Sequence, residues 1–255
     1  MLVIKLLLTP ALIGIVSLMG RRWGPSVSGW FIGLPLTSAP IVLFFALDHG
    51  TTFAAHAAQG TLLGLISGDC FCLVYSWLSF RVGWLGSLLL GWGAFFASTF
   101  VLEHISLPLV LAFVVVIICL VIMVKLFPDT RGKSAALRSP PWELYVRMGV
   151  AAVFVLLLTE VSSLLGPQLS GLLTPFPVFA SILGAFTHHF QGNVAACRLL
   201  RGVVIGTFTF AVFFLVIAGA IAIWGIVLSF CLALLALLVL HTCSLMLMRR
   251  YTDTY

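Results

Sequence analysis

The chain has 255 residues, of which 62% are hydrophobic and 8% are charged, and its formal net charge is +6. Soluble domains carry about a quarter charged residues, so this composition excludes an ordinary soluble domain. Apolar runs recur without the period-two alternation of barrel strands, which indicates transmembrane helices. The basic residues lie in short connections, where they set topology rather than bind nucleic acid. We expect an all-α, polytopic protein whose surroundings are the lipid bilayer.

About nine transmembrane helices are predicted in chain order. They cover about residues 2–20, 27–47, 54–79, 84–102, 105–127, 143–165, 169–189, 200–219 and 221–248. The polar stretch from Pro128 to Trp142 is the only sizeable polar connection. It divides a first unit, residues 1–142, from a second unit, residues 143–255.

A spaced pattern, Gly-Pro-x-x-Ser-Gly followed after five residues by Pro, occurs twice. It runs from Gly24 to Pro35 and again from Gly166 to Pro177, with a constant shift of 142 positions. The same shift pairs Phe44 with Phe186, Gly50 with Gly192, Ala54 with Ala196, Gly60 with Gly202 and Gly64 with Gly206. The chain is therefore an internal duplication.

The positions of the arginines indicate that the second copy is inverted. Five predicted spans precede that copy. Because this number is odd, the second copy must insert in the opposite orientation to the first. Arg21 and Arg22 align with uncharged residues of the second copy, whereas Arg198 and Arg201 align with uncharged residues of the first. Under the positive-inside rule, this exchange predicts two inverted repeats, an outside N-terminus and a cytoplasmic C-terminus.

Prolines are expected to break the second and seventh helices at matched positions. Pro removes a backbone donor and clashes with the preceding turn, and the freed backbone groups are tolerated at membrane depth only against protein or a wet cavity. The candidate substrate-binding residues at these breaks are Pro35, Thr37, Ser38, Pro40, Pro175, Pro177 and Ser181. A simple packed Pro kink is the alternative. We expect no metal ion and no cofactor.

Two carboxyl groups within predicted spans are candidates for proton coupling. Asp69 lies deep in the third helix, and Glu160 lies in the sixth helix near its outer end. An ionisable group in hydrocarbon must be paired, protonated or in contact with water. The alternatives are a structural hydrogen bond for Asp69 and an interfacial position for Glu160.

Glycines four residues apart predict close helix packing. They are Gly60, Gly64 and Gly68 in the third helix, and Gly202 and Gly206 in the eighth. Small residues at this spacing let two backbones approach closely. We expect these two helices to pack against the broken ones.

The opening stretch, from Ile4-Lys5-Leu6-Leu7-Leu8 to Gly33-Leu34-Pro35-Leu36-Thr37-Ser38, resembles the GlpM-like family of small bacterial inner-membrane proteins. The resemblance is clearest over residues 4–50, and the second copy has Phe176-Pro177-Val178-Phe179 where the family has Leu-Pro-Leu-Thr. Glu160 lies where the family has a Ser-Glu segment. Members are about half as long, so this chain resembles a fused pair. The resemblance implies a bacterial inner-membrane location and an association with glycerol metabolism and alginate production, but no defined activity.

A small secondary transporter or exporter is the function that these features favour. Its solute would bind between the broken helices, and one copy would rock against the other. An accessory protein of envelope polysaccharide synthesis and a lipid flippase are the alternatives, and a homodimer is possible. The sequence has no nucleophile–base or phosphate-loop motif, so we do not expect an enzyme.

Overall fold

The structure is a computed structural model that describes residues 2–35, 38–130, 142–150, 152–153 and 176–252. These residues are mostly helical and include no strand. The helices are α1 (Leu2–Trp23), α2 (Pro25–Ile32), α3 (Ser38–His49), α4 (Thr51–Leu78), α5 (Trp84–Glu103), α6 (Leu109–Leu126), α9 (Val178–Gln191) and α10 (Asn193–Thr252). Residues 143–150 form a further helical segment.

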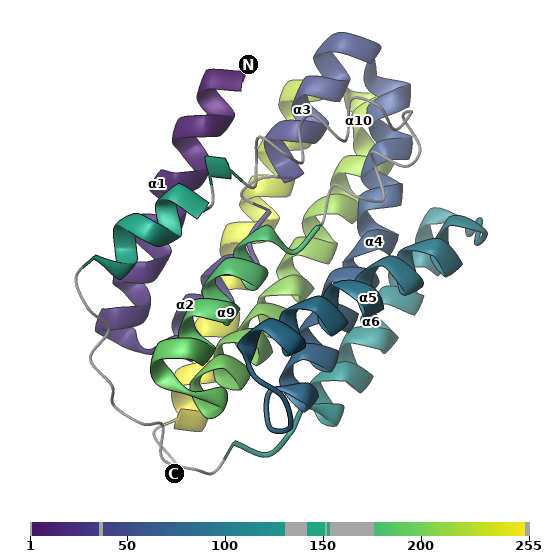
Figure 1. Cartoon of the computed structure of the whole chain (residues 1–255). Helices are drawn as coiled ribbons and strands as arrows, with labels where there is room; N and C mark the ends of the chain where they lie inside the picture. Colours follow the sequence, from purple (N-terminus) through teal and green to yellow (C-terminus); the bar gives the residue numbers. More distant parts are fainter. Residues whose placement is uncertain (1, 36–37, 131–141, 151, 154–175, 253–255) are drawn as a thin grey trace.

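Four of the described helices are long and apolar enough to cross a membrane. They cover Thr51–Leu78, Trp84–Glu103, Leu109–Leu126 and Asn193–Thr242. The prediction of an all-helical chain is therefore confirmed for the described residues, and the length and composition of these four helices agree with a membrane protein. α1 begins at one end of the helical bundle, and α10 ends at the opposite end (Figure 1).

The second predicted helix is broken, as its prolines indicate. α2 ends at Ile32, the backbone of Gly33, Leu34 and Pro35 is not helical, and α3 begins at Ser38. In the second copy, α9 begins at Val178, directly after the non-helical residues Phe176 and Pro177. The residues that precede Phe176 in the seventh predicted helix lie outside the described part of the chain.

Single glycines make the sharpest corners between consecutive helices. Gly24, Gly50, Gly192 and Gly225 have φ of 92°, 88°, 87° and 76°, with ψ between 167° and 177°. This backbone region is essentially restricted to glycine. Gly50 and Gly192 are 142 positions apart, so the spacing found in the sequence relates two corners of the same geometry.

The corner at Gly225 corrects one predicted boundary. The sequence predicted that the eighth helix would end near residue 219, but the helix that starts at Asn193 continues to this corner, and a second helix follows it to Thr252. Gly219 itself stays helical, and a Cβ there would lie 3.5 Å from Leu109 Cδ2 of α6. The chain turns at Gly225, which has a positive φ, and not at Gly219.

The core is built on α4 and the first part of α10, which lie side by side and run in opposite directions (Figure 1). α2 packs against the same part of α10 through small residues. A Cβ on Gly33 would lie 2.5 Å from the Cα of Gly206, and one on Gly202 would lie 2.4 Å from the carbonyl oxygen of Ser26. For Gly202 and Gly206, the predicted packing against a broken helix is confirmed.

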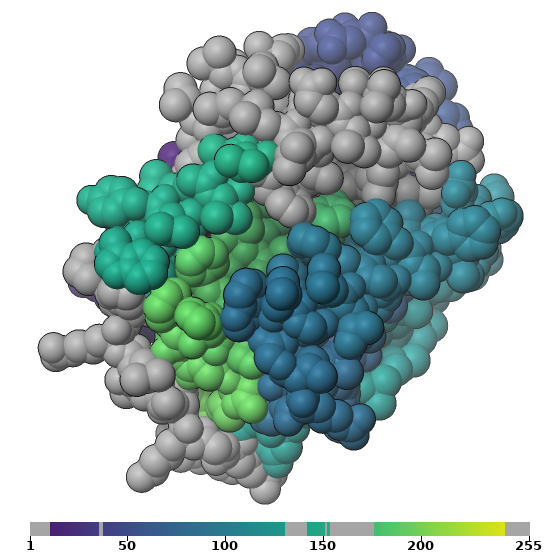
Figure 2. Space-filling model, viewed as in Figure 1, coloured from purple at the N-terminus to yellow at the C-terminus, as the bar shows by residue number. Residues whose placement is uncertain are grey.

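The outer surface is apolar. α5 exposes Leu85, Leu89, Phe96 and Phe100, and α6 exposes Val110, Val114, Ile118 and Ile122. Figure 2 shows α5 in blue beside α9 in green on one face of the molecule. Exposed aliphatic and aromatic side chains of this density fit contact with lipid rather than water.

Candidate functional site

A cavity of about 70 Å³ lies where the two helix breaks meet. Ile32, Gly33 and Leu34 line it from the end of α2, and Phe176, Pro177 and Val178 line it from the start of α9. Ser38, at the start of α3, also lines it. A water molecule needs about 10–15 Å³ by the same kind of measure, so the cavity has room for several waters or a small solute.

The central helices close the cavity from the other side. α4 contributes Leu65, Gly68, Asp69 and Cys72, and α10 contributes Val203, Thr207 and Phe210. Four pairs of lining residues differ by 142 positions: Leu34 and Phe176, Ser38 and Ala180, Leu65 and Thr207, and Gly68 and Phe210. Positions related by the shift of 142 residues therefore line one cavity.

Asp69 is the only carboxylic acid among the described lining residues, and no Lys, Arg or His is among them. Its side chain is 1% exposed. The Oδ1 atom lies 3.2 Å from the hydroxyl oxygen of Thr207. The Oδ2 atom is buried and has no hydrogen-bond partner among the described residues. A buried carboxyl group in this setting requires a proton, a cation or water.

The Thr207 hydroxyl group links Asp69 to the backbone of α10. Its oxygen lies 3.2 Å from Asp69 Oδ1 and 3.0 Å from the carbonyl oxygen of Val203. A hydroxyl group has one donor and two acceptor lone pairs. Thr207 can therefore donate to an ionised Asp69, or it can donate to Val203 and accept from a protonated Asp69.

The structure brings together some of the sequence-predicted site residues. Ser38, Pro177 and Asp69 line the cavity. Pro35 directly follows the lining residue Leu34, and Pro40 lies in the first turn of α3, outside the lining.

Ser181 lies outside the described lining of the cavity. It is buried in the first turns of α9 but does not line the cavity, and its hydroxyl oxygen accepts a hydrogen bond from Trp92 Nε1 at 2.9 Å. The hydroxyl group holds α9 against α5. Thr37, Pro175 and Glu160 lie outside the described residues.

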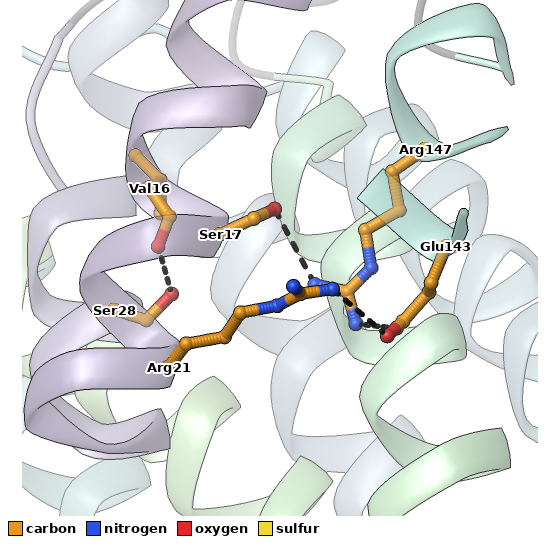
Figure 3. A network of polar contacts seen from close by, with 6 residues as sticks. All are labelled: Val16, Ser17, Arg21, Ser28, Glu143 and Arg147. Atoms are coloured by element: carbon orange, nitrogen blue, oxygen red, sulfur yellow. Dashed lines mark hydrogen bonds and ion pairs between the residues drawn. The ribbon is translucent and has the colours of Figure 1, made fainter. Parts of the chain in front are cut away.

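A buried ionic cluster was not predicted from the sequence. Glu143 accepts a hydrogen bond from Arg147 Nη2, and Glu143 Oε2 lies 3.7 Å from Arg21 Nη2. Arg147 Nη1 also donates to Ser17 Oγ at 3.3 Å. Figure 3 shows the arginine side chains converging on Glu143, one from α1 and one from residues 143–150. The spacing of Glu143 and Arg147, four residues apart in a helix, was the available signal.

This ionic cluster joins α1 to the helical segment of residues 143–150. Glu143 and Arg147 are 1% and 7% exposed, whereas Arg21 is 37% exposed. The Arg147 guanidinium also lies 5.3 Å above the Phe186 ring of α9. A second cavity of about 20 Å³ adjoins the cluster. Its lining consists of Ser17, Gly20, Arg21, Pro25, Ser28, Arg147, Thr187, Gln191 and Leu199.

Comparisons with protein-family models, with curated proteins and with solved structures find no match to this chain. The resemblance to the GlpM-like family therefore remains a prediction.

Proposed function

We propose that the chain is a secondary transporter or exporter of a small solute, built from two inverted repeats of about nine spans in all. The observation that carries the proposal is the central cavity, because it lies between two helix breaks and holds a buried carboxyl group without a full set of partners. Transporters with inverted repeats bind their solutes at such breaks near the bilayer midplane.

The directions of the helices support the inverted arrangement. α4 runs opposite to residues 193–224 of α10, which are its repeat partner (Figure 1). α1 runs opposite to residues 143–150, and Gly14 of α1 approaches Met148 of that segment. The four lining pairs separated by 142 positions fit an axis that passes through the cavity.

The surroundings of Asp69 support proton coupling. The carboxyl group lies in the cavity without a basic residue among the described lining residues, and the Thr207 hydroxyl group 3.2 Å away can bond to it in either protonation state. In this proposal, Asp69 takes up a proton on one side of the membrane and releases it on the other. One repeat rocks against the other to change the side to which the cavity opens. The proposed location is a bacterial inner membrane, with the N-terminus outside and the C-terminus in the cytoplasm.

Transport by the purified protein in sealed lipid vesicles tests this proposal. The solutes are formate, nitrate, sodium, methylammonium, glycerol and urea, and a dye inside the vesicles reports proton movement. We expect one class of solute to move protons with it. Asp69→Asn should lose accumulation driven by a pH gradient but retain exchange of solute between the two sides.

Asp48→Asn is the matched control, because it removes a carboxylate from the exposed end of α3. It should transport like the unmodified protein. If Asp69→Asn keeps proton-coupled accumulation, its assigned role is wrong. If no solute of any class moves through the unmodified protein, the transporter proposal is wrong.

Access of water to the cavity distinguishes a transporter from an accessory protein. Single cysteines at Thr37 and Phe179 should react with a small water-soluble thiol reagent in a variant without other cysteines. Protection of both positions under transport conditions would favour a dry, packed interior and the accessory role. Lipid scrambling in the same vesicles would identify a flippase.

A further inference from the structure

We propose that the solute of the central cavity is a small organic ammonium cation, which exchanges with the proton of Asp69. This inference rests on the proposed transport function and names the chemical class of the solute. When the cation binds, the O–H bond of the carboxyl group breaks, and its proton passes to water on the side to which the cavity is open. The ammonium group then pairs with the carboxylate, so the cation and the proton cross the membrane in opposite directions.

The segments that form the cavity supply no positive charge for Asp69. The described lining residues belong to residues 26–48, 57–80, 151–187 and 202–240, and the sequence of these four segments contains no Lys, Arg or His. A buried ionised carboxyl group is costly unless an opposite charge accompanies it. A proton or a positively charged solute is therefore the charge that Asp69 accepts.

The other titratable groups around the cavity leave this charge to Asp69. Cys72 is the only other titratable side chain in the described lining, and a thiol is neutral at physiological pH. Titratable side chains on the surrounding helices that lie outside the lining include Asp48 and His49 of α3, Cys70 and Tyr75 of α4, Glu103 of α5, Cys119 and Lys125 of α6, His188 of α9, and Arg201 and His241 of α10. Asp69 therefore sets the charge of the described lining.

The helix ends at the cavity carry smaller charges than an ionised Asp69. α2 ends there, whereas α3 and α9 begin there. A helix end is equivalent to about half an elementary charge, positive at the start and negative at the end. Two helix starts and one helix end leave about half a positive charge. The full negative charge of an ionised Asp69 exceeds this sum, so the site favours a cation.

The oxygen atoms of the lining match an ammonium group better than a bare metal ion. Asp69 Oδ1 lies 3.2 Å from the Thr207 hydroxyl group, and Asp69 Oδ2 has no hydrogen-bond partner among the described residues. Asp69, Thr207 and Ser38 are the described lining residues with side-chain oxygens. A hard metal cation takes about six oxygen ligands, whereas an alkylammonium group has at most three N–H donors. Three such side chains are few for a metal ion and sufficient for an ammonium group.

The rest of the lining suits the apolar part of an organic cation. Three phenylalanines line the cavity, namely Phe176, Phe179 and Phe210. Aromatic ring faces attract ammonium groups, most strongly where water is excluded. The cavity volume of about 70 Å³ has room for about five waters, so the cation has about five non-hydrogen atoms. Methylammonium and tetramethylammonium fall within this limit.

The test uses these two cations as probes, with sodium, formate and glycerol for comparison. Tetramethylammonium has no N–H proton, so it cannot cross the lipid as a neutral base, and a pH change inside the vesicles then reports the protein. Thermal unfolding of the purified protein reports binding. Asp69→Asn is compared with Asp48→Asn, as above. Phe210→Leu is compared with Phe213→Leu, which changes a buried residue of the same helix that does not line the cavity.

We expect both ammonium ions to raise the unfolding temperature, and tetramethylammonium entry to make the inside of the vesicles more alkaline. Asp69→Asn should raise the concentration for half-maximal stabilisation about tenfold and abolish the pH change, while exchange at saturating cation persists. Asp48→Asn should change that concentration less than about twofold. Phe210→Leu should raise it about fivefold, and Phe213→Leu less than about twofold. The phenylalanine pair carries the comparison if Asp69→Asn does not fold.

Four results would overturn the inference. They are the absence of stabilisation by both ammonium ions, equal effects of the two variants in either pair, ammonium entry without proton release, and uptake restricted to sodium, anions or neutral solutes. The last result would leave the transporter proposal standing. Ammonium binding that depends on Asp69, without uptake of any solute, would support the cation site and refute transport.

Discussion

Replacing Gly202 with Ala tests the contact between α2 and the first part of α10. A methyl group at this position would lie 2.4 Å from the carbonyl oxygen of Ser26 and 3.0 Å from the amide nitrogen of Trp30. Both atoms belong to the backbone of α2, so no side-chain rotation relieves the clash. α2 and α10 would have to move apart along their shared face.

Gly60 is a matched control, because it is the repeat partner of Gly202. A methyl group on Gly60 meets no atom within 4 Å. Both substitutions gain the higher helix propensity of Ala, which contributes about 1 kcal/mol in a helix interior. Overpacking against a rigid neighbour costs about 1–3 kcal/mol. The propensity gain cancels in the comparison, so Gly202→Ala should be about 1–3 kcal/mol less stable than Gly60→Ala.

This difference is measured by heating each variant in detergent and recording the fraction of protein that stays monodisperse at each temperature. A change of 1 kcal/mol shifts the midpoint by about 2–4 °C for a domain of this size, so the two variants should differ by about 2–12 °C. Gly60→Ala should match or exceed the unmodified protein. The packing argument is refuted if Gly202→Ala unfolds at the same temperature as Gly60→Ala.

Two further substitutions test the corners and the α5–α9 contact. Gly192→Ala should lower stability by about 1–3 kcal/mol, because the φ of Gly192 is 87°. Gly83→Ala should have little effect, because the φ of Gly83 is −64°. Thermal unfolding compares the two variants, and equal midpoints would contradict the strain argument. Trp92→Phe removes the donor to Ser181 and should cost about 1 kcal/mol. A double-mutant cycle with Ser181→Ala isolates that bond, and a coupling energy near zero would show that it does not hold α9 to α5.

Local backbone chemistry made the helix breaks predictable from the sequence. The rings of Pro35 and Pro177 remove a backbone N–H group and clash with the preceding turn. The non-helical backbone beside each proline could therefore be predicted without knowing which residues pack around it. The contact of Gly202 and Gly206 with α2 was predictable for a similar reason, since small residues four apart leave a groove on one helix face.

The ionic cluster and the role of Ser181 depend on tertiary structure. Arg21 and Glu143 are far apart in the sequence, and only the pairing of α1 with residues 143–150 brings them together. Ser181 was assigned to the site because it follows a proline break. Its hydroxyl direction depends on helical phase and on Trp92, which lies on another helix. The eighth helix end was misplaced because Gly219 and Gly225 cannot be distinguished by residue type.

The corners at Gly24, Gly50 and Gly192 each leave a single residue between two consecutive helices. A link this short has no polar loop that could cross the bilayer separately from its flanking helices. The helices on either side of each corner are therefore expected to insert together, with the glycine at the tip. Because α2 and α3 lie between the corners at Gly24 and Gly50, we expect α1 to α4 to insert as one unit, and α9 to insert with the first part of α10.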